Sequence, residues 1–259
     1  MQKPSGSERM VELVRRATRR LLLPATLGTR QVVFKVDTGA SCSLVPWSDV
    51  QKGGLEDLVD VVAVKVGGMQ VCGILRAPLL CKRSIALWGL IHVSEECREP
   101  LLGLDVLFNH RCSIVPSRSL PHLVVREMAC RVPRSVPLTR HLVTLNGHPA
   151  DALLDTGASH SLIPLDLVHA LGLMVVQRQR AVTLFFTDGS EDSTEYVPHV
   201  CICLGGREAL EGERGGWEVR GRELDVYGRH GDLILGMNVL RKFRMAFHED
   251  YRMVVSPLH

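Results

Sequence analysis

The pentapeptide Asp-Thr-Gly-Ala-Ser occurs twice in the chain, at residues 37–41 and, 118 positions later, at residues 155–159. A strand-like apolar run comes directly before each copy. After the copies, Ser-Leu-Val-Pro at 43–46 and Ser-Leu-Ile-Pro at 161–164 stand at matching offsets. The repeated unit is therefore longer than the pentapeptide itself.

A later pair of segments also matches between the two halves. Residues 100–107 read PLLGLDVL, and residues 233–240 read LILGMNVL. Each segment is followed by a run of alternating apolar and polar residues, at 111–115 and 244–248. Because four features recur in the same order, chance is excluded as the explanation. We interpret the chain as an internal duplication.

Composition favours short strands over long helices. Apolar residues make up 46% of the chain and aromatic residues only 5%, so the expected core is aliphatic. Thirteen prolines and 23 glycines are scattered along the sequence, which is typical of many short segments joined by turns. Asn146-Gly147, between two strand-like runs, predicts a hairpin turn. The sequence therefore predicts an all-β fold with few short helices.

The repeats and the segment between them suggest four parts. Residues 126–137, with two prolines and three arginines, suit a linker between the halves. Arginines follow apolar residues near the N-terminus, which is consistent with a basic tail or a short helix. The expected division is a tail or helix at 1–24, a first lobe at 25–125, a linker at 126–137 and a second lobe at 138–259.

Charge and cysteine usage argue against several classes of protein. A net charge of +3 without a long basic block gives little support for binding nucleic acid. No apolar run is long enough for a membrane span, and Leu21–Leu23 is too short for a signal-peptide core, so we expect a cytoplasmic protein. The eight cysteines form no CxxC pair and have no histidine at metal-ligand spacing. We expect buried reduced thiols and no metal site.

The chemistry of the repeated motif suggests a pair of carboxyl groups. An Asp at the end of a buried strand enters a low-dielectric environment, where an isolated carboxylate is costly. The Gly permits a tight turn, and the Thr and Ser hydroxyls can orient the carboxylate. One such Asp is adequately explained as a turn residue. Two of them, Asp37 and Asp155, can meet across a pseudo-twofold axis and share a proton, because carboxylates about 3 Å apart do not both ionise easily.

The motif resembles that of a known protease family. An apolar residue before Asp-Thr-Gly-Ala-Ser, with a later Leu-Gly-x-(Asp/Asn), is similar to the retropepsins, the aspartic proteases of retroviruses and retrotransposons. Residues 146–155 are especially similar to retrotransposon proteases of the gypsy type. The resemblance covers residues 28–125 and 138–257, that is, both halves of the chain. Retropepsins supply one such Asp per subunit and work as homodimers, whereas this chain carries two copies.

The resemblance implies two closed β-barrel lobes related by a pseudo-twofold axis, with Asp37 and Asp155 as the catalytic pair. Thr38 and Thr156 are expected to form crossed hydrogen bonds between the two loops. A hairpin flap is expected over each half of the cleft, although an ordinary exposed hairpin fits those sequences equally well. The residues implied are Gly39, Ala40, Ser41, Gly157, Ala158 and Ser159 in the loops, Val66, Gly67, Gly68, Asp188 and Gly189 in the flaps, and Gly103 and Gly236 packed behind the site.

The activity implied is that of an aspartic endopeptidase in which water between Asp37 and Asp155 attacks a peptide bond. No cofactor is expected, because the two carboxyl groups supply both proton transfers. The expected partner is a peptide or a polyprotein of the retroelement type, with neither nucleic acid nor membrane. We expect a monomer, with a homodimer that pairs the Asp residues between chains as the alternative. A non-proteolytic peptide-binding module with the same fold is the other alternative.

Overall fold

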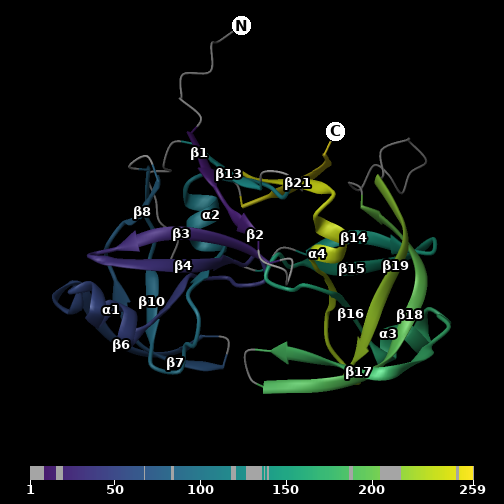
Figure 1. The fold of residues 1–259 in the computed structure, drawn as a ribbon. Helices are drawn as coiled ribbons and strands as arrows, with labels where there is room; N and C mark the ends of the chain where they lie inside the picture. The colour runs from purple at the N-terminus through teal and green to yellow at the C-terminus, as the bar shows by residue number, and fades with distance from the viewer. Residues whose placement is uncertain are drawn as a thin grey trace, which may run out of the picture.

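The computed structural model of the chain confirms the all-β prediction (Figure 1). It describes residues 9–15, 20–66, 68–82, 85–117, 121–126, 136, 138, 140–186, 189–204, 217–248 and 251–258. Strands account for 57% of these described residues and helices for 13%. The helices are short: α1 (Trp47–Gly53), α2 (Leu104–Asn109), α3 (Leu165–Ala170), α4 (Met237–Leu240) and the 3₁₀ turn η1 (Glu56–Leu58).

The second lobe is a closed six-stranded barrel. Its last barrel strand returns to the first, where Val143 pairs with Leu204. Asn146 and Gly147 have φ of 51° and 89°, the left-handed conformations that a two-residue hairpin needs, so the turn prediction is confirmed. The strands, in spatial order, are β14 (Arg140–Leu145), β15 (His148–Leu154), β20 (Leu233–Leu235), β16 (Ser161–Pro164), β19 (Trp217–Tyr227) and β18 (Gly189–Leu204), with β17 (Val176–Phe186) paired outside the ring on β18.

The first lobe repeats this order with one interruption. Where the second lobe has the single long strand β18, the first has two strands, β7 and β8, joined by residues 76–78. Pro78, which lacks a backbone N–H, lies in this break, whereas β18 passes Pro198 with a shift in register between Val197 and Val200. The strands, in spatial order, are β6 (Val59–Val66), β7 (Met69–Leu75), β10 (Ile91–Ser94), β5 (Leu44–Pro46), β11 (Leu101–Leu102), β4 (Arg30–Val36), β3 (Leu21–Leu27), β8 (Leu79–Cys81) and β9 (Ile85–Leu87), with β2 (Val14–Arg15) on β3.

A third sheet joins the lobes, at the top of Figure 1. Its central pairing connects the halves, with Ser113 opposite Ala246 and Ile114 opposite Met245. Next to it, the rings of Phe108 and Phe247 meet edge to face, with centroids 5.2 Å apart. The strands, in order, are β1 (Arg9–Glu12), β13 (His122–Val125), β12 (Ser113–Val115), β21 (Phe243–Phe247) and β22 (Met253–Pro257).

The N-terminal segment differs from its sequence prediction. In place of a basic tail or helix over 1–24, residues 9–12 form the edge strand β1, paired with β13. The sheet of the first lobe also begins before residue 25, because Leu21 and Leu23 are fully buried in its core. Except for Arg126 and Val136, the expected linker at 126–137 lies outside the described residues.

One hydrophobic cluster runs through both lobes and the sheet between them. It contains side chains from β4, such as Phe34, together with Met245 and Phe247 of the joining sheet. Within the described parts of the chain, none of the helices has the length and apolar character that a membrane crossing requires. The continuous core holds the two lobes in a defined relative position, and this matters for the site between them.

Candidate active site

The two Asp-Thr-Gly loops begin where β4 and β15 end, and each is anchored in the same way. The amide of Asp37 donates to the carbonyl of Leu102 at 2.9 Å, and that of Asp155 donates to the carbonyl of Leu235, also at 2.9 Å. These bonds continue the parallel pairings of β4 with β11 and of β15 with β20. Each Asp therefore starts its loop from a fixed position in its own barrel.

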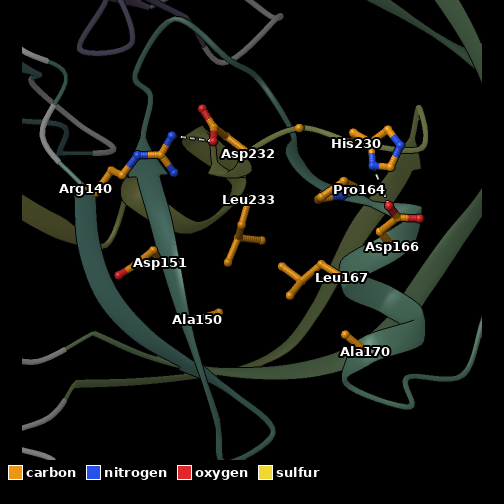
Figure 2. Close-up of a pocket in the computed structure, with 11 residues that line it drawn as sticks. Arg140, Ala150, Asp151, Pro164, Asp166, Leu167, Ala170, His230, Asp232 and Leu233 are labelled. Carbon is orange, nitrogen blue, oxygen red and sulfur yellow. Dashed lines mark hydrogen bonds and ion pairs between the residues drawn. The ribbon is translucent and has the colours of Figure 1, made fainter.

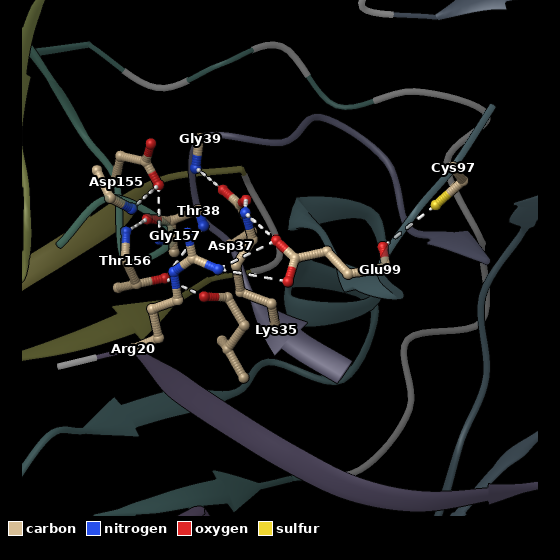
Figure 3. Close-up of polar contacts among 12 residues, drawn as sticks. Arg20, Lys35, Asp37, Thr38, Gly39, Cys97, Glu99, Asp155, Thr156 and Gly157 are labelled. Carbon is tan, nitrogen blue, oxygen red and sulfur yellow. Dashed lines mark hydrogen bonds and ion pairs between the residues drawn. The ribbon is translucent and has the colours of Figure 1, made fainter. Parts of the chain in front are cut away.

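Thr38 and Thr156 connect the loops through crossed hydrogen bonds (Figure 3). The amide of Thr38 donates to the hydroxyl of Thr156 at 3.1 Å, and the amide of Thr156 donates to the hydroxyl of Thr38 at 3.0 Å. Each hydroxyl in turn donates to a carbonyl of the opposite lobe, that of Leu154 at 2.5 Å and that of Val36 at 2.8 Å. Both threonines are at most 1% exposed, so four buried hydrogen bonds join the loops within one chain.

Gly39 and Gly157 let the two carboxyl groups approach each other. Their amides donate to Oδ1 of Asp37 at 3.0 Å and to Oδ1 of Asp155 at 2.6 Å, respectively. A Cβ added to Gly39 would lie 2.6 Å from Cγ of Asp155, and one added to Gly157 would overlap the carboxyl group of Asp37. Each Asp therefore lies directly against the glycine of the other loop, and the structure brings Asp37 and Asp155 together.

The electrostatic environment of Asp155 favours its protonated form. Burial, followed by the charge of Asp37 and a hydrogen bond with it, raises the pKa of Asp155 well above its ordinary value, although Lys35 and the amide of Gly157 act in the opposite direction. The side chain keeps some solvent access. Two carboxyl groups that lie this close together, here those of Asp155 and Asp37, typically share one proton.

Lys35 is a site residue that the sequence analysis missed. Its Nζ lies 3.0 Å from Oδ2 of Asp37, and only 14% of its side chain is exposed. Burial alone would lower the pKa of Lys35, but Asp37, Glu99 and Asp155 outweigh burial, so the pKa is raised and the amine stays charged. The sequence held one signal for this residue: Lys35 stands two residues before Asp37. Because alternate residues of a strand share a face, its side chain lies on the same side as the Asp37 carboxyl group.

The remaining loop residues and the two later glycines support the loops from behind. The amide of Ala158 donates to Oδ1 of Asp155 at 3.2 Å, while Ala40 and Ala158 accept bonds of 2.9 and 2.8 Å from the amides of Leu104 and Met237. A Cβ on Gly103 would lie 2.9 Å from the Ala40 carbonyl, and one on Gly236 would lie 2.8 Å from the Ala158 carbonyl. The other predicted loop residues, Ser41 and Ser159, are half-exposed.

Behind each loop, a buried serine donates a hydrogen bond to the residue two positions after Gly103 or Gly236. Ser43 donates to Oδ1 of Asp105 at 2.7 Å in the first lobe, and Ser161 donates to Oδ1 of Asn238 at 2.6 Å in the second. Asp105 is 1% exposed, and its Oδ2 has no hydrogen-bond partner within the described parts of the chain. Burial raises the pKa of Asp105, although the hydrogen bonds from Ser43 and Val106 and the charge of His92 lower it.

We expect Asp105→Asn to stabilise the protein at neutral pH. A carboxyl group with a raised folded-state pKa contributes most to stability below its unfolded pKa, and the contribution is lost as pH rises through the folded value. The amide of Asn keeps the acceptor for Ser43 without a buried charge. Thermal unfolding at pH 7 should show Tm higher by about 2–4 °C, with a smaller gain at pH 4. The reverse change, Asn238→Asp, should lower Tm at pH 7, and an unchanged or lower Tm for Asp105→Asn would contradict the argument.

Hairpins occupy both predicted flap segments. In the first lobe, Val66 pairs with Met69, and Gly68 has φ of 84°. In the second, Phe186 pairs with Gly189 at the end of a longer hairpin. The other two predicted flap residues, Gly67 and Asp188, lie outside the described residues. Both hairpins, β6–β7 and β17–β18, lie on the side of the molecule opposite the joining sheet (Figure 1).

A separate cavity of about 450 Å³ lies on the second lobe, away from both Asp-Thr-Gly loops. Figure 2 shows two polar contacts in it, the ion pair of Arg140 with Asp232 and the contact of His230 with Asp166. Neither Asp37 nor Asp155 lines this cavity. Among the described residues, no three His, Cys, Asp or Glu side chains are grouped so that they would hold a metal ion.

The comparison with protein families concerns the second lobe. The sequence model of the aspartyl protease family matches residues 142–239, which include the second Asp-Thr-Gly loop and Gly236. No curated protein has significant similarity to the chain. The match supports an aspartyl protease family, and with it a peptide hydrolase, for the half of the chain that carries Asp155.

Proposed function

We propose that the chain is a retropepsin-like aspartic endopeptidase in which a single chain supplies both catalytic carboxyl groups, Asp37 and Asp155. The crossed hydrogen bonds of Thr38 and Thr156 are the observation that carries the proposal, because they hold the two loops face to face within one chain. The two matched series of elements, one in each half, support a tandem duplication of a retropepsin-like unit.

Hydrolysis at this site needs one ionised and one protonated carboxyl group. The carboxylate takes a proton from water while the water oxygen attacks the carbonyl carbon of the peptide bond, and the acid gives its proton to the carbonyl oxygen. The tetrahedral intermediate then collapses, the C–N bond breaks, and the amine nitrogen receives the proton that came from water. The carboxyl groups of Asp37 and Asp155 suffice for these transfers.

The substrate proposed is an extended, unstructured segment of a peptide or of a polyprotein of the retroelement type. An extended peptide can hydrogen-bond to strands on either side of it. The hairpins β6–β7 and β17–β18 present such strands, and Val61 on β6 is 88% exposed. We propose that these hairpins act as flaps over the bound peptide.

Digestion of a library of unstructured peptides by the purified full chain, from pH 3 to pH 8, tests the proposal. We expect internal cleavage that is inhibited competitively by a peptide containing a statine residue, whose hydroxyl group mimics the tetrahedral intermediate. Chelators and thiol reagents should have no effect. Failure to cleave any peptide at any pH would overturn the proposal.

Dilution separates the single-chain site from a homodimer. If both carboxyl groups come from one chain, activity per molecule stays constant as the enzyme is diluted, and sedimentation shows an active monomer. If the Asp residues pair between chains, activity per molecule falls once the dimer dissociates.

A non-proteolytic peptide-binding module is the second candidate, and one observation favours it. The ammonium of Lys35 contacts the carboxylate of Asp37, where it can compete with the attacking water. This alternative expects the statine peptide to bind without any turnover of substrate peptides, so the digestion experiment with a parallel binding measurement distinguishes the two.

A further inference from the structure

Lys35 introduces a difference in charge between two loops that share their crossed threonine bonds and their glycine donors. It lies on β4, two residues before Asp37, and its side chain reaches the same face as the carboxylate. Its Nζ is 3.0 Å from Oδ2 of Asp37 and 3.4 Å from Oε1 of Glu99. Arg20 contacts Glu99 in turn, with 3.3 Å between Nη1 and Oε1 (Figure 3). Arg20, Glu99, Lys35 and Asp37 thus form a series of ion pairs that ends at Asp37.

The second lobe has no such cation at the equivalent position. Leu153, two residues before Asp155, is buried and apolar. Among the described residues, the backbone hydrogen bonds to the Asp155 side chain come from the amides of Gly157 and Ala158, and no lysine or arginine is ion-paired with it. The Asp155 carboxyl group thus has one backbone donor more than that of Asp37, which accepts from Gly39, whereas Asp37 has a cation at hydrogen-bond distance.

A positive charge at hydrogen-bond distance favours the ionised form of the nearer carboxyl group. The energy of a charge pair falls with distance, so Lys35 stabilises a negative charge on Asp37 more than one on Asp155. Among the described residues, Glu99 is ion-paired with both Lys35 and Arg20, and it partly offsets the charge of Lys35. The raised pKa of Asp155 is consistent with this distribution.

We propose that Lys35 is a positioning residue that sets the direction of proton transfer, keeping Asp37 as the carboxylate that accepts the proton of water and leaving the shared proton on Asp155. This assignment rests on the proposed proteolytic function. In the first step water gives a proton to Asp37, its oxygen bonds to the carbonyl carbon, and Asp155 protonates the carbonyl oxygen. In the second step Asp37 protonates the leaving nitrogen, Asp155 recovers a proton from the hydroxyl group, and the starting state returns.

The pH profile of kcat/KM tests the electrostatic role. The active dyad holds one proton, and a cation beside it lowers both of the pH values at which activity is lost. Lys35→Leu introduces the residue that the second lobe has at the equivalent position, Leu153. It should therefore move both the acid and the alkaline limb of the pH profile to higher pH. On the acid limb, kcat/KM should fall about 10-fold or more relative to the wild type. Lys35→Arg should restore most of the profile. Glu99→Gln should move the limbs in the opposite direction, because it leaves Lys35 less neutralised.

Lys82→Met is the matched control, since it removes one lysine charge from the same lobe at an exposed pair with Glu12. Its profile should coincide with that of the wild type. A Lys35→Leu variant that is folded and active with unshifted limbs would overturn the proposal, because a purely structural role would change kcat or KM without moving the profile.

A second measurement is independent of proteolysis. In the full chain labelled with carbon-13 at the aspartate carboxyl groups, the resonances of Asp37 and Asp155 are identified by their loss in Asp37→Asn and Asp155→Asn. We expect Asp37 to be ionised at pH values where Asp155 is still protonated, and the difference to shrink in Lys35→Leu. If Asp155 ionises first in the wild type, the assignment is wrong even for an active protease. If Asp37 ionises before Asp155 as expected but the protein cleaves no peptide, the proposed proteolytic function is wrong while the role of Lys35 in the ionisation order stands.

Discussion

Asp37→Asn and Asp155→Asn should each lower kcat/KM for a peptide substrate by about 10²- to 10⁴-fold. An amide at either position cannot exchange the proton that hydrolysis requires, and the remaining carboxyl group cannot serve as both acid and base. The measurement is cleavage of one identified peptide by the purified variants under single-turnover conditions. Activity that survives either change would contradict a dyad formed by these two residues.

Stability measurements separate this loss from unfolding. The pKa of Asp155 is raised, so its carboxyl group contributes least to stability at pH values above its folded pKa. Asp155→Asn should therefore leave Tm at neutral pH unchanged or higher. Asp151→Asn is the matched control, because this exposed residue of β15 stands only four positions before Asp155. It should keep full activity.

Gly157→Ala should abolish most of the activity while the protein stays folded. The added Cβ would occupy the position of the Asp37 carboxyl group, which must then rotate away from Asp155. A displacement of about 1 Å at a reacting group costs on the order of 10²-fold in rate. Gly39→Ala should act in the same way on Asp155, since its Cβ would lie 2.6 Å from Cγ of that residue. We expect kcat to fall at least about 10²-fold in both variants.

Gly172→Ala provides the comparison for this pair. Gly172 has φ of 59° at the end of α3, with open space around it, so alanine is strained there without touching the site. Its stability cost, about 1 kcal/mol, should come with unchanged activity per folded molecule. If Gly157→Ala kept wild-type kcat, the close approach of the two loops in solution would be wrong.

The local parts of this protein follow from its sequence. The hairpin at Asn146-Gly147 formed as expected, because only residues that tolerate positive φ suit such a turn. The position of each Asp at the end of a buried strand follows from the apolar runs before it. Duplication of these patterns was enough to indicate which two carboxyl groups should meet.

Features that depend on distant pairings were not predictable in the same way. Residues 9–12 form a strand only because β13 offers an open edge to them, and nothing in their own pattern indicates that partner. Likewise, β12 and β21 join the lobes through residues that are more than 100 positions apart in the sequence. β-Structure draws its stability from such cross-strand contacts, so a short segment does not specify its own neighbours.

The sequence by itself determined the two Asp-Thr-Gly-Ala-Ser loops and the β-rich character of the halves, because turns and strand periodicity are encoded within a few residues. The tertiary structure alone decided that the loops cross through Thr38 and Thr156 and that Lys35 reaches Asp37 and Glu99. Lys35 and Glu99 stand far apart in the sequence, and their charges act over a few ångströms. The packing of β4 beside β11 brings these side chains together and gives Asp37 a cation that Asp155 lacks.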